Sequence, residues 1–277
     1  MKQHIFATII IASLTLMPAS AQRLVILHTN DTHSQILPDR LNGNQGGVER
    51  RLQYINSVIA EYGRKNVLIL DAGDYNQGTP YYTMGHGLLE RDLVNAMGVD
   101  VTTLGNHEFD DGMADLASRL EKAKYKVLAC NYDFSKTPLR KIVKPYAIVR
   151  KGGMKIGIVG ATAYLEGKVL RENINGAVRL NTIEQVNRWA AFLREKKHCD
   201  IVILLSHLGF ENNGEECYDK PSDVIMAENS RNLDFIIGGH SHTFMSKPYV
   251  AKDLDGKEVP IVQDGSKGFF VGRLDIE

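Results

Sequence analysis

Short apolar runs recur along the chain from residue 23 onward, and their hydrophobicity is nearly continuous. Such runs, rich in β-branched residues, are typical of strands that are covered on both faces of a sheet. The seven runs are RLVILH, NVLILDAGD, DVTTLGNHE, KVLACN, MKIGIVG, DIVILLSHLG and LDFIIGGHSH. A last run, FFVGRLDIE, predicts one more strand.

Amphipathic stretches separate many of these runs. The stretch 48–63 places its apolar residues on one face of a helix, and a glycine stands just past its end. The stretch 88–98 ends in the same way. In 181–197, Asn181 is a plausible N-cap and Glu184 follows three residues later, a variant of the capping box. The alternation predicts an α/β fold.

Two glycine-containing turns predict β-hairpins, at Gly152-Gly153 and at Asp255-Gly256. Hairpins join antiparallel strands, so we expect mixed sheets. The pattern shows no internal repeat, low-complexity tract or linker beyond the first 21 residues. One α/β domain covering residues 22–277 is therefore the simplest organisation.

The first residues, MKQHIFATIIIASLTLMPASAQ, have the features of a secretory signal peptide. Lys2 is basic, residues 5–17 are mostly apolar, and Ala19-Ser20-Ala21 matches a cleavage site. The alternative is a membrane anchor, but the apolar run is too short to cross a bilayer well. We predict a signal peptide at 1–21 and an exported, periplasmic protein without a membrane span.

Charge and cysteine content exclude several classes of protein. Lys plus Arg and Asp plus Glu both number 33 among 277 residues, which argues against binding to a nucleic-acid polymer or an anionic membrane. Phosphate binding would then need a local positive charge. Cys130, Cys199 and Cys217 form no C-x-x-C motif, so we expect unpaired thiols with at most one disulfide.

Metal-ligating residue types follow five of the apolar runs. In α/β folds, ligands gather outside the carboxyl ends of the strands. Each motif alone is weak, because D-x-H is commonly an Asx-turn and GNHE could be a tight turn with a solvated carboxylate. Together they predict one site, made of Asp31, His33, Asp74, Asn106, His107, Asp110, His207, His240 and His242. His28, His86 and His198 lack this context and are expected to be structural.

This set of side chains suits a centre of two divalent ions, which needs one shared carboxylate and several neutral ligands. Asp74 is the natural bridge between the ions. One ion would take Asp31, His33 and His242, and the other Asn106, His207 and His240. A water molecule held between two such ions loses its proton near neutral pH and becomes a hydroxide nucleophile. The neutral histidine and asparagine ligands leave the two ions with a net positive charge, which attracts a phosphate. Manganese, zinc, iron and cobalt all accept these ligands.

The motifs ILHTNDTHSQ, DAGDYNQGTP, GNHEFDDG and GGHSHT resemble those of the calcineurin-like metallophosphoesterases, and more narrowly the 5′-nucleotidase family. The resemblance runs from Leu24 to the C-terminus. It implies a four-layer α/β/β/α sandwich, the metal ligands named above and hydrolysis of phosphate esters of nucleotides. That family also includes UDP-sugar hydrolases and 2′,3′-cyclic phosphodiesterases.

The resemblance also implies that His107 and Asp110 are the catalytic pair. The spacing agrees, since a carboxylate three residues past an imidazole can orient the ring, and an imidazolium so held can stabilise charge on the leaving oxygen. Asn131 stands where the family often has an asparagine, and a substrate contact there is expected on that ground alone.

Most members of this family continue into a C-terminal domain that recognises the nucleotide, whereas this sequence resembles the N-terminal catalytic domain only. We therefore expect that a separate chain supplies the recognition contacts. The alternative is a self-sufficient phosphatase whose own loops, 42–47 and 211–221, shape the pocket. The substrate could be a nucleotide, a nucleotide sugar, a cyclic nucleotide or another phosphate ester. A third, weaker interpretation is a metal-stabilised subunit without activity.

Overall fold

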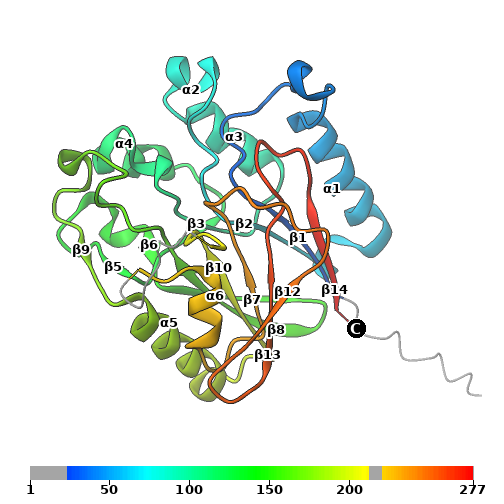
Figure 1. Ribbon diagram of the computed structural model, residues 1–277. Helices are drawn as coiled ribbons and strands as arrows, with labels where there is room; N and C mark the ends of the chain where they lie inside the picture. Colours follow the sequence, from blue (N-terminus) through cyan, green and yellow to red (C-terminus); the bar gives the residue numbers. More distant parts are fainter. Residues whose placement is uncertain (1–23, 212–219, 277) are drawn as a thin grey trace, which may run out of the picture.

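The computed structural model describes residues 24–211 and 220–276, which form two facing six-stranded sheets (Figure 1). The first sheet has the order β14-β1-β2-β3-β4-β6. Its strands are β1 (Leu24–Thr29), β2 (Val67–Asp71), β3 (Val101–Thr103), β4 (Lys126–Leu128), β6 (Val143–Lys144) and β14 (Gly272–Ile276). All neighbours in this sheet are parallel except β14, which pairs antiparallel with β1.

The second sheet has the order β12-β13-β11-β10-β8-β7. Its strands are β7 (Tyr146–Lys151), β8 (Met154–Ala161), β10 (Ile201–Ser206), β11 (Phe235–Ile237), β12 (Tyr249–Lys252) and β13 (Glu258–Val262). The four central strands are parallel, and both edge strands are antiparallel because the two predicted hairpins join them to their neighbours. A small ribbon pairs β5 (Tyr132–Asp133) with β9 (Val178–Arg179).

Three apolar layers hold these elements together. Leu70, Ile158 and Ile203 belong to the core between the two sheets. A second core lies between the first sheet and the helices α1 (Val48–Tyr62), α3 (Leu88–Ala96) and α4 (Gly112–Leu120). A third core joins the second sheet to α5 (Thr182–Ala191) and α6 (Asp223–Glu228). The four-layer sandwich is confirmed.

The helix ends follow the sequence signals. The Gly63 N–H donates to the Ile59 carbonyl at 2.8 Å and closes α1, and the Asn181 side chain accepts the Glu184 N–H at 2.9 Å at the start of α5. Beyond Ala191 the predicted helix continues as a π-helical turn, Phe192–Lys196. The helices α2 (Pro80–Gly85), α4 and α6 are short, and the sequence pattern did not predict them. The 3₁₀ turns are Arg40–Asn42, Arg64–Asn66, His107–Phe109, Pro138–Lys141 and Arg171–Ile174.

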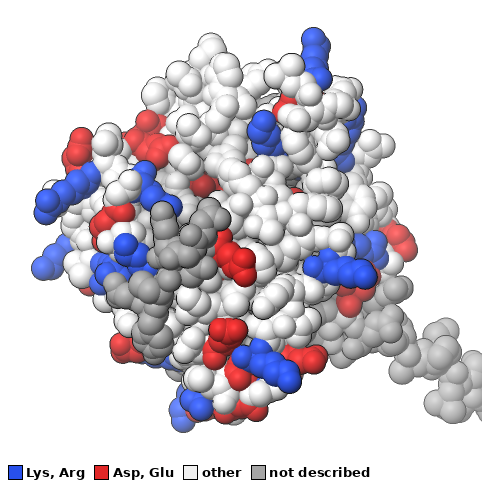
Figure 2. Space-filling model, viewed as in Figure 1, with Lys and Arg blue, Asp and Glu red and all other residues white. Residues whose placement is uncertain are grey.

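Basic and acidic side chains are interspersed on the face shown in Figure 2, in agreement with the balanced composition. Cys130 and Cys199 are buried and unpaired, as expected, while Cys217 lies outside the described residues. Among the residues that the structure describes, no helix is long and apolar enough to cross a bilayer. The predicted signal peptide lies outside those residues.

Candidate metal centre

The loops that follow β1, β2, β3, β10 and β11 converge where the carboxyl ends of the two sheets meet. Backbone bonds connect them: the Asp31 N–H donates to the Gly73 carbonyl at 2.9 Å, and the His33 N–H to the Asp74 carbonyl at 3.0 Å. The His240 N–H donates to Asp31 Oδ2 at 2.9 Å and thereby joins the second sheet to the first. The predicted convergence of strand ends is therefore observed.

Five of the seven predicted ligands have a left-handed backbone conformation. The φ angles are 48° at Asp31, 44° at His33, 54° at Asp74, 76° at His240 and 55° at His242. Residues other than glycine rarely adopt this conformation, and the strain persists only where the surroundings impose it. Such strain clusters at functional sites, which supports a functional reason for these loops.

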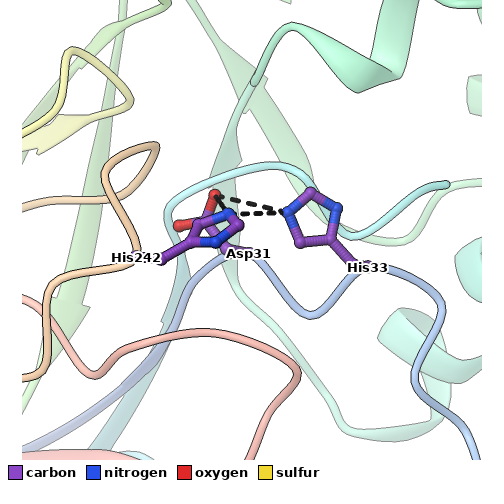
Figure 3. A group of neighbouring side chains, drawn as sticks. All are labelled: Asp31, His33 and His242. Carbon is purple, nitrogen blue, oxygen red and sulfur yellow. Dashed lines mark hydrogen bonds and ion pairs between the residues drawn. The ribbon is translucent and has the colours of Figure 1, made fainter. Parts of the chain in front are cut away.

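Asp31, His33 and His242 form the first compact group, drawn in Figure 3. Both imidazoles point toward the Asp31 carboxylate from different loops. Their Nε2 atoms lie 2.9 Å from each other, and at 3.8 Å (His33) and 3.4 Å (His242) from Asp31 Oδ1. A pair of imidazole nitrogens and a carboxylate oxygen so placed is a borderline-hard donor set that suits a divalent ion.

Asp74, His207 and His240 form the second group. His207 Nε2 lies 3.0 Å from Asp74 Oδ2 and 3.8 Å from Asp31 Oδ1. Asp74 also belongs to a third group, with His33 and His107. The Asp74 carboxylate is therefore within reach of both predicted ion positions, which is the location required of a bridge.

Several donor atoms of the site make no hydrogen bond among the described residues, although His207 Nε2 lies within ion-pair distance of Asp74. Within residues 24–211 and 220–276, Asp31 Oδ1, Asn106 Oδ1 and His207 Nε2 are buried without a hydrogen bond. In two of these side chains the other polar atom is hydrogen-bonded. Asp31 Oδ2 accepts from the Asn30 side chain at 2.6 Å, and His207 Nδ1 donates to the Ala72 carbonyl at 2.6 Å. A buried polar atom without a partner is costly, and a cation would satisfy all three. The residues fit divalent ions.

Charge coupling inside the site is strong. Burial lowers the pKa of His207, but the carboxylates of Asp74 and Asp31 outweigh it and raise the pKa to about 10. Burial, together with the charge of His207, lowers the pKa of His240 to about 3. Although burial alone would raise the pKa of Asp74, His207 lowers it, so this carboxylate stays ionised. Divalent ions would replace the proton on His207 as the positive charge.

His107 and Asp110 form a pair beside the two groups. His107 Nδ1 lies 2.7 Å from Asp110 Oδ2, and this hydrogen bond raises the pKa of His107. The backbone N–H of His107 donates to Asp74 Oδ1 at 2.8 Å, which holds this residue near the predicted bridge. His107, together with His33 and Asn106, lines a cavity of about 420 Å³ that is also lined by His240 and His242. The geometry presents an oriented imidazole to that cavity.

The alternative considered for GNHE, a tight turn with a solvated carboxylate, does not hold for Glu108. This side chain is completely buried and accepts the N–H groups of Asp74 at 2.9 Å, Tyr75 at 3.1 Å and Gly105 at 2.6 Å. It therefore holds the loop of the predicted bridge against the loop that carries Asn106. The sequence offered no signal for this function, because a glutamate in a tight turn is usually exposed.

Asn131 occupies a structural position. Its Nδ2 donates to the Thr162 carbonyl at 2.8 Å, and its Oδ1 accepts the Thr162 N–H at 3.0 Å. The side chain lines a second cavity, of about 260 Å³, that also includes His240. A substrate contact for Asn131 stays a prediction, since its amide already bonds within the protein.

The histidines expected to be structural lie outside the three groups. His28 is buried beneath β14, where its ring leaves room only for glycine at position 272. Burial lowers the pKa of His28 to about 4. His86 Nδ1 lies 3.3 Å from Asp111 Oδ2 on an exposed turn.

The profile of the family described as Calcineurin-like phosphoesterase matches residues 24–244. This chain belongs to the calcineurin-like phosphoesterase family. A 5′-nucleotidase from Rattus norvegicus is 32% identical over 295 residues, 96% of this chain and 48% of that protein. An apyrase from Aedes albopictus is 32% identical over 288 residues, 91% of this chain and 48% of that protein.

A solved structure gives the same relationship. The 5′-nucleotidase precursor of Thermus thermophilus superposes with a TM-score of 0.82 at 34% identity, over 92% of this chain and 51% of that one. The resemblance to 5′-nucleotidases is confirmed. The calcineurin-like phosphoesterase chain spans about half the length of these relatives. These matches lend no support to the predicted separate partner chain.

Proposed function

We propose that this protein is a dimetal phosphohydrolase that cleaves phosphate esters of nucleotides. The observation that carries the proposal is the buried set of Asp31 Oδ1, Asn106 Oδ1 and His207 Nε2, which make no hydrogen bond among the described residues and lie beside the Asp74 carboxylate. Asp31, His33 and His242 would hold one ion, and Asn106, His207 and His240 the other, with Asp74 between them. Manganese, zinc, iron and cobalt are all accepted by this donor set.

When bound, the ions supply Lewis-acid stabilisation of a phosphoryl group and a hydroxide nucleophile at neutral pH. The remaining chemistry belongs to the side chains. His107, protonated and held by Asp110, donates a hydrogen bond to the phosphoryl group or the leaving oxygen as negative charge develops there. Buried Glu108 fixes the relative position of the loops that carry Asp74 and Asn106.

Nucleotides are the proposed substrates because relatives at about a third identity are named 5′-nucleotidase and apyrase. A nucleotide sugar, a 2′,3′-cyclic nucleotide or a non-nucleotide monoester would use the same centre. An oriented His107–Asp110 pair argues against the non-catalytic subunit, which has no need of it. Export rests on the predicted signal peptide alone, and the separate recognition chain stays a prediction.

The test is a hydrolysis assay on the purified protein with added manganese. The panel contains nucleoside 5′-monophosphates, a UDP-sugar, a 2′,3′-cyclic nucleotide and p-nitrophenyl phosphate. We expect release of phosphate from at least one nucleotide at a kcat/KM within the usual enzyme range, about 10⁴ M⁻¹s⁻¹ or more. Hydrolysis of none of these compounds in the metal-loaded protein would refute the proposal.

The number of ions is tested by elemental analysis of Asp74→Ala. We expect two ions per chain in the wild type and close to none in this variant, because Asp74 is within reach of both positions. Asp92→Ala, which removes an exposed carboxylate paired with Arg91, is the matched control and should keep full occupancy. Double occupancy in Asp74→Ala would remove Asp74 from the bridging position.

A further inference from the structure

A second cavity, separate from the one that His107 lines, adjoins the metal centre at His240. It measures about 260 Å³ and lies between the loop after β8 and the β5–β9 ribbon. We call it the Tyr164 pocket and define it by Tyr164, Lys168, Arg179, Lys220 and His240. Because His240 lines both cavities, a molecule bound at the proposed ions could extend into this pocket.

The pocket is positively charged. Among the residues that the structure describes, three cationic side chains and one carboxylate line it; the carboxylate, that of Glu166, accepts a hydrogen bond from the Tyr132 hydroxyl at 2.9 Å. Lys168 is close enough to His240 to lower its pKa. Thr182, the first residue of the ten-residue helix α5, also lines the cavity, so the positive end of that helix adds to the field.

Two of the cations are arranged around the tyrosine ring. The Arg179 guanidinium carbon lies 4.9 Å, and the Lys220 Nζ 4.2 Å, from the centroid of the Tyr164 ring. Cation–π contacts of this length are attractive and restrict these otherwise flexible side chains. The same contacts compete with stacking of a nucleobase on the ring. The pocket therefore suits an anion better than an aromatic group.

We propose that the Tyr164 pocket binds a second anionic group, a phosphate or a carboxylate, of a molecule whose first phosphate lies at the metal centre. The inference rests on the proposed function, because it places the first phosphate at the ions. It assigns a substrate preference to the catalytic domain itself, namely for phosphate esters that carry an additional negative charge at a fixed distance. Charge-assisted hydrogen bonds from Arg179 and Lys168 would recognise that group.

The experiment measures binding to the manganese-loaded protein by calorimetry. The ligands are ω-carboxyalkylphosphonates of increasing chain length, each compared with the alkylphosphonate of the same length. At one chain length we expect the carboxylate to tighten binding by about 10-fold, the value of one good charge-assisted contact. In Arg179→Met and in Lys168→Met, this advantage should fall to about 2-fold or less. Lys252→Met, on the exposed side of β12, is the matched control and should keep it.

Two results would overturn the inference: no chain length at which the carboxylate helps the wild type, or an advantage that persists in both variants. Binding of the plain alkylphosphonate shows whether each variant still forms the metal centre. The ratio of the two affinities requires no turnover, whereas the proposed function is tested by hydrolysis. A protein that shows the expected affinity ratio but hydrolyses nothing would refute only the proposed function. A protein that hydrolyses nucleotides but does not show the ratio would refute only the anion-binding Tyr164 pocket.

Discussion

Two candidate ligands, Asp31 and His207, are each fixed through one polar atom while another faces the site. Asp31 Oδ2 accepts from the Asn30 side chain and the His240 N–H, and Asp31 Oδ1 accepts nothing among the described residues. His207 donates from Nδ1 to a carbonyl, which leaves Nε2 facing the site. The orientation of these donors is therefore set before an ion arrives, as outer-shell hydrogen bonds do in metalloproteins.

His107 is expected to act on the substrate without holding an ion. We predict that His107→Ala lowers kcat by about 10²–10⁴-fold, the usual contribution of one positioned acid–base group, while the metal content stays near that of the wild type. His240→Ala is the comparison, because it removes a predicted ligand. Elemental analysis and steady-state kinetics on both variants decide: equal metal loss in the two would make His107 a ligand.

The Asp110 carboxylate should set the pH range of the same imidazole. Its hydrogen bond raises the pKa of His107, so in the wild type the ring stays protonated to higher pH. Removing that charge in Asp110→Asn lowers the pKa, and the fall of kcat/KM on the alkaline side should move to lower pH. Asp110→Glu keeps the charge and should shift the profile less. A profile in Asp110→Asn that is unmoved, or moved to higher pH, contradicts this assignment.

Among the larger elements, the turn after β11 shows why two glycines precede the last two histidines. A Cβ on Gly239 would lie 2.9 Å from the Ala72 carbonyl oxygen and 2.9 Å from His207 Nδ1. A Cβ on Gly238 would lie 2.2 Å from Asp223 Oδ2. The backbone thus passes close to β2 and β10, which brings His240 and His242 to different groups of ligands.

We therefore predict that Gly239→Ala weakens metal binding by at least about 10-fold and lowers the melting temperature. The added methyl group pushes against the backbone and against the atoms that orient His207 and Asp31. Gly85→Ala, at the end of α2, is the control, since a Cβ there meets nothing within 4 Å. Manganese titration of the two variants is the measurement. Wild-type affinity in Gly239→Ala would show that the turn tolerates a side chain.

The sequence predicted those elements whose pattern is local. Continuous apolar runs marked most strands of both sheets, and repeated Asp, Asn and His at strand ends marked the candidate metal centre. The helices α2 and α6 were missed because six residues give fewer than two turns of a helical pattern. The Tyr164 pocket was not predicted for another reason. Nothing in the sequence distinguishes Lys168 and Arg179 from other surface residues, and only the fold brings them to the same cavity as His240.

At the level of the whole molecule, the candidate metal centre lies between the two sheets. Asp31, His33, Asp74 and Asn106 follow strands of the first sheet, and the other three predicted ligands follow strands of the second. Ions bound between them would link both halves of the sandwich, and any ligand that binds only the folded state stabilises it. The stability of the domain should therefore depend on metal.

Removal of metal with a chelator should lower the melting temperature of the wild type. Manganese at 100 times its dissociation constant contributes about 2.7 kcal/mol, which for a domain of this size corresponds to roughly 5–11 °C. Asp74→Ala should melt at the same temperature with and without the chelator. Differential scanning calorimetry with and without manganese is the measurement. A wild-type melting temperature that does not respond would exclude a tightly bound ion.

The pairing of β1 with β14 also constrains how the domain is made. Leu24 pairs with Ile276, so the first described strand receives one of its neighbours from the other end of the fold. During folding, β1 can pair with β2 early, but its other edge stays open until β14 is in place. An open edge on an apolar strand is a template for wrong pairing with another chain. A folding chain of this protein thus depends, until β14 pairs with β1, on whatever keeps that edge from other strands.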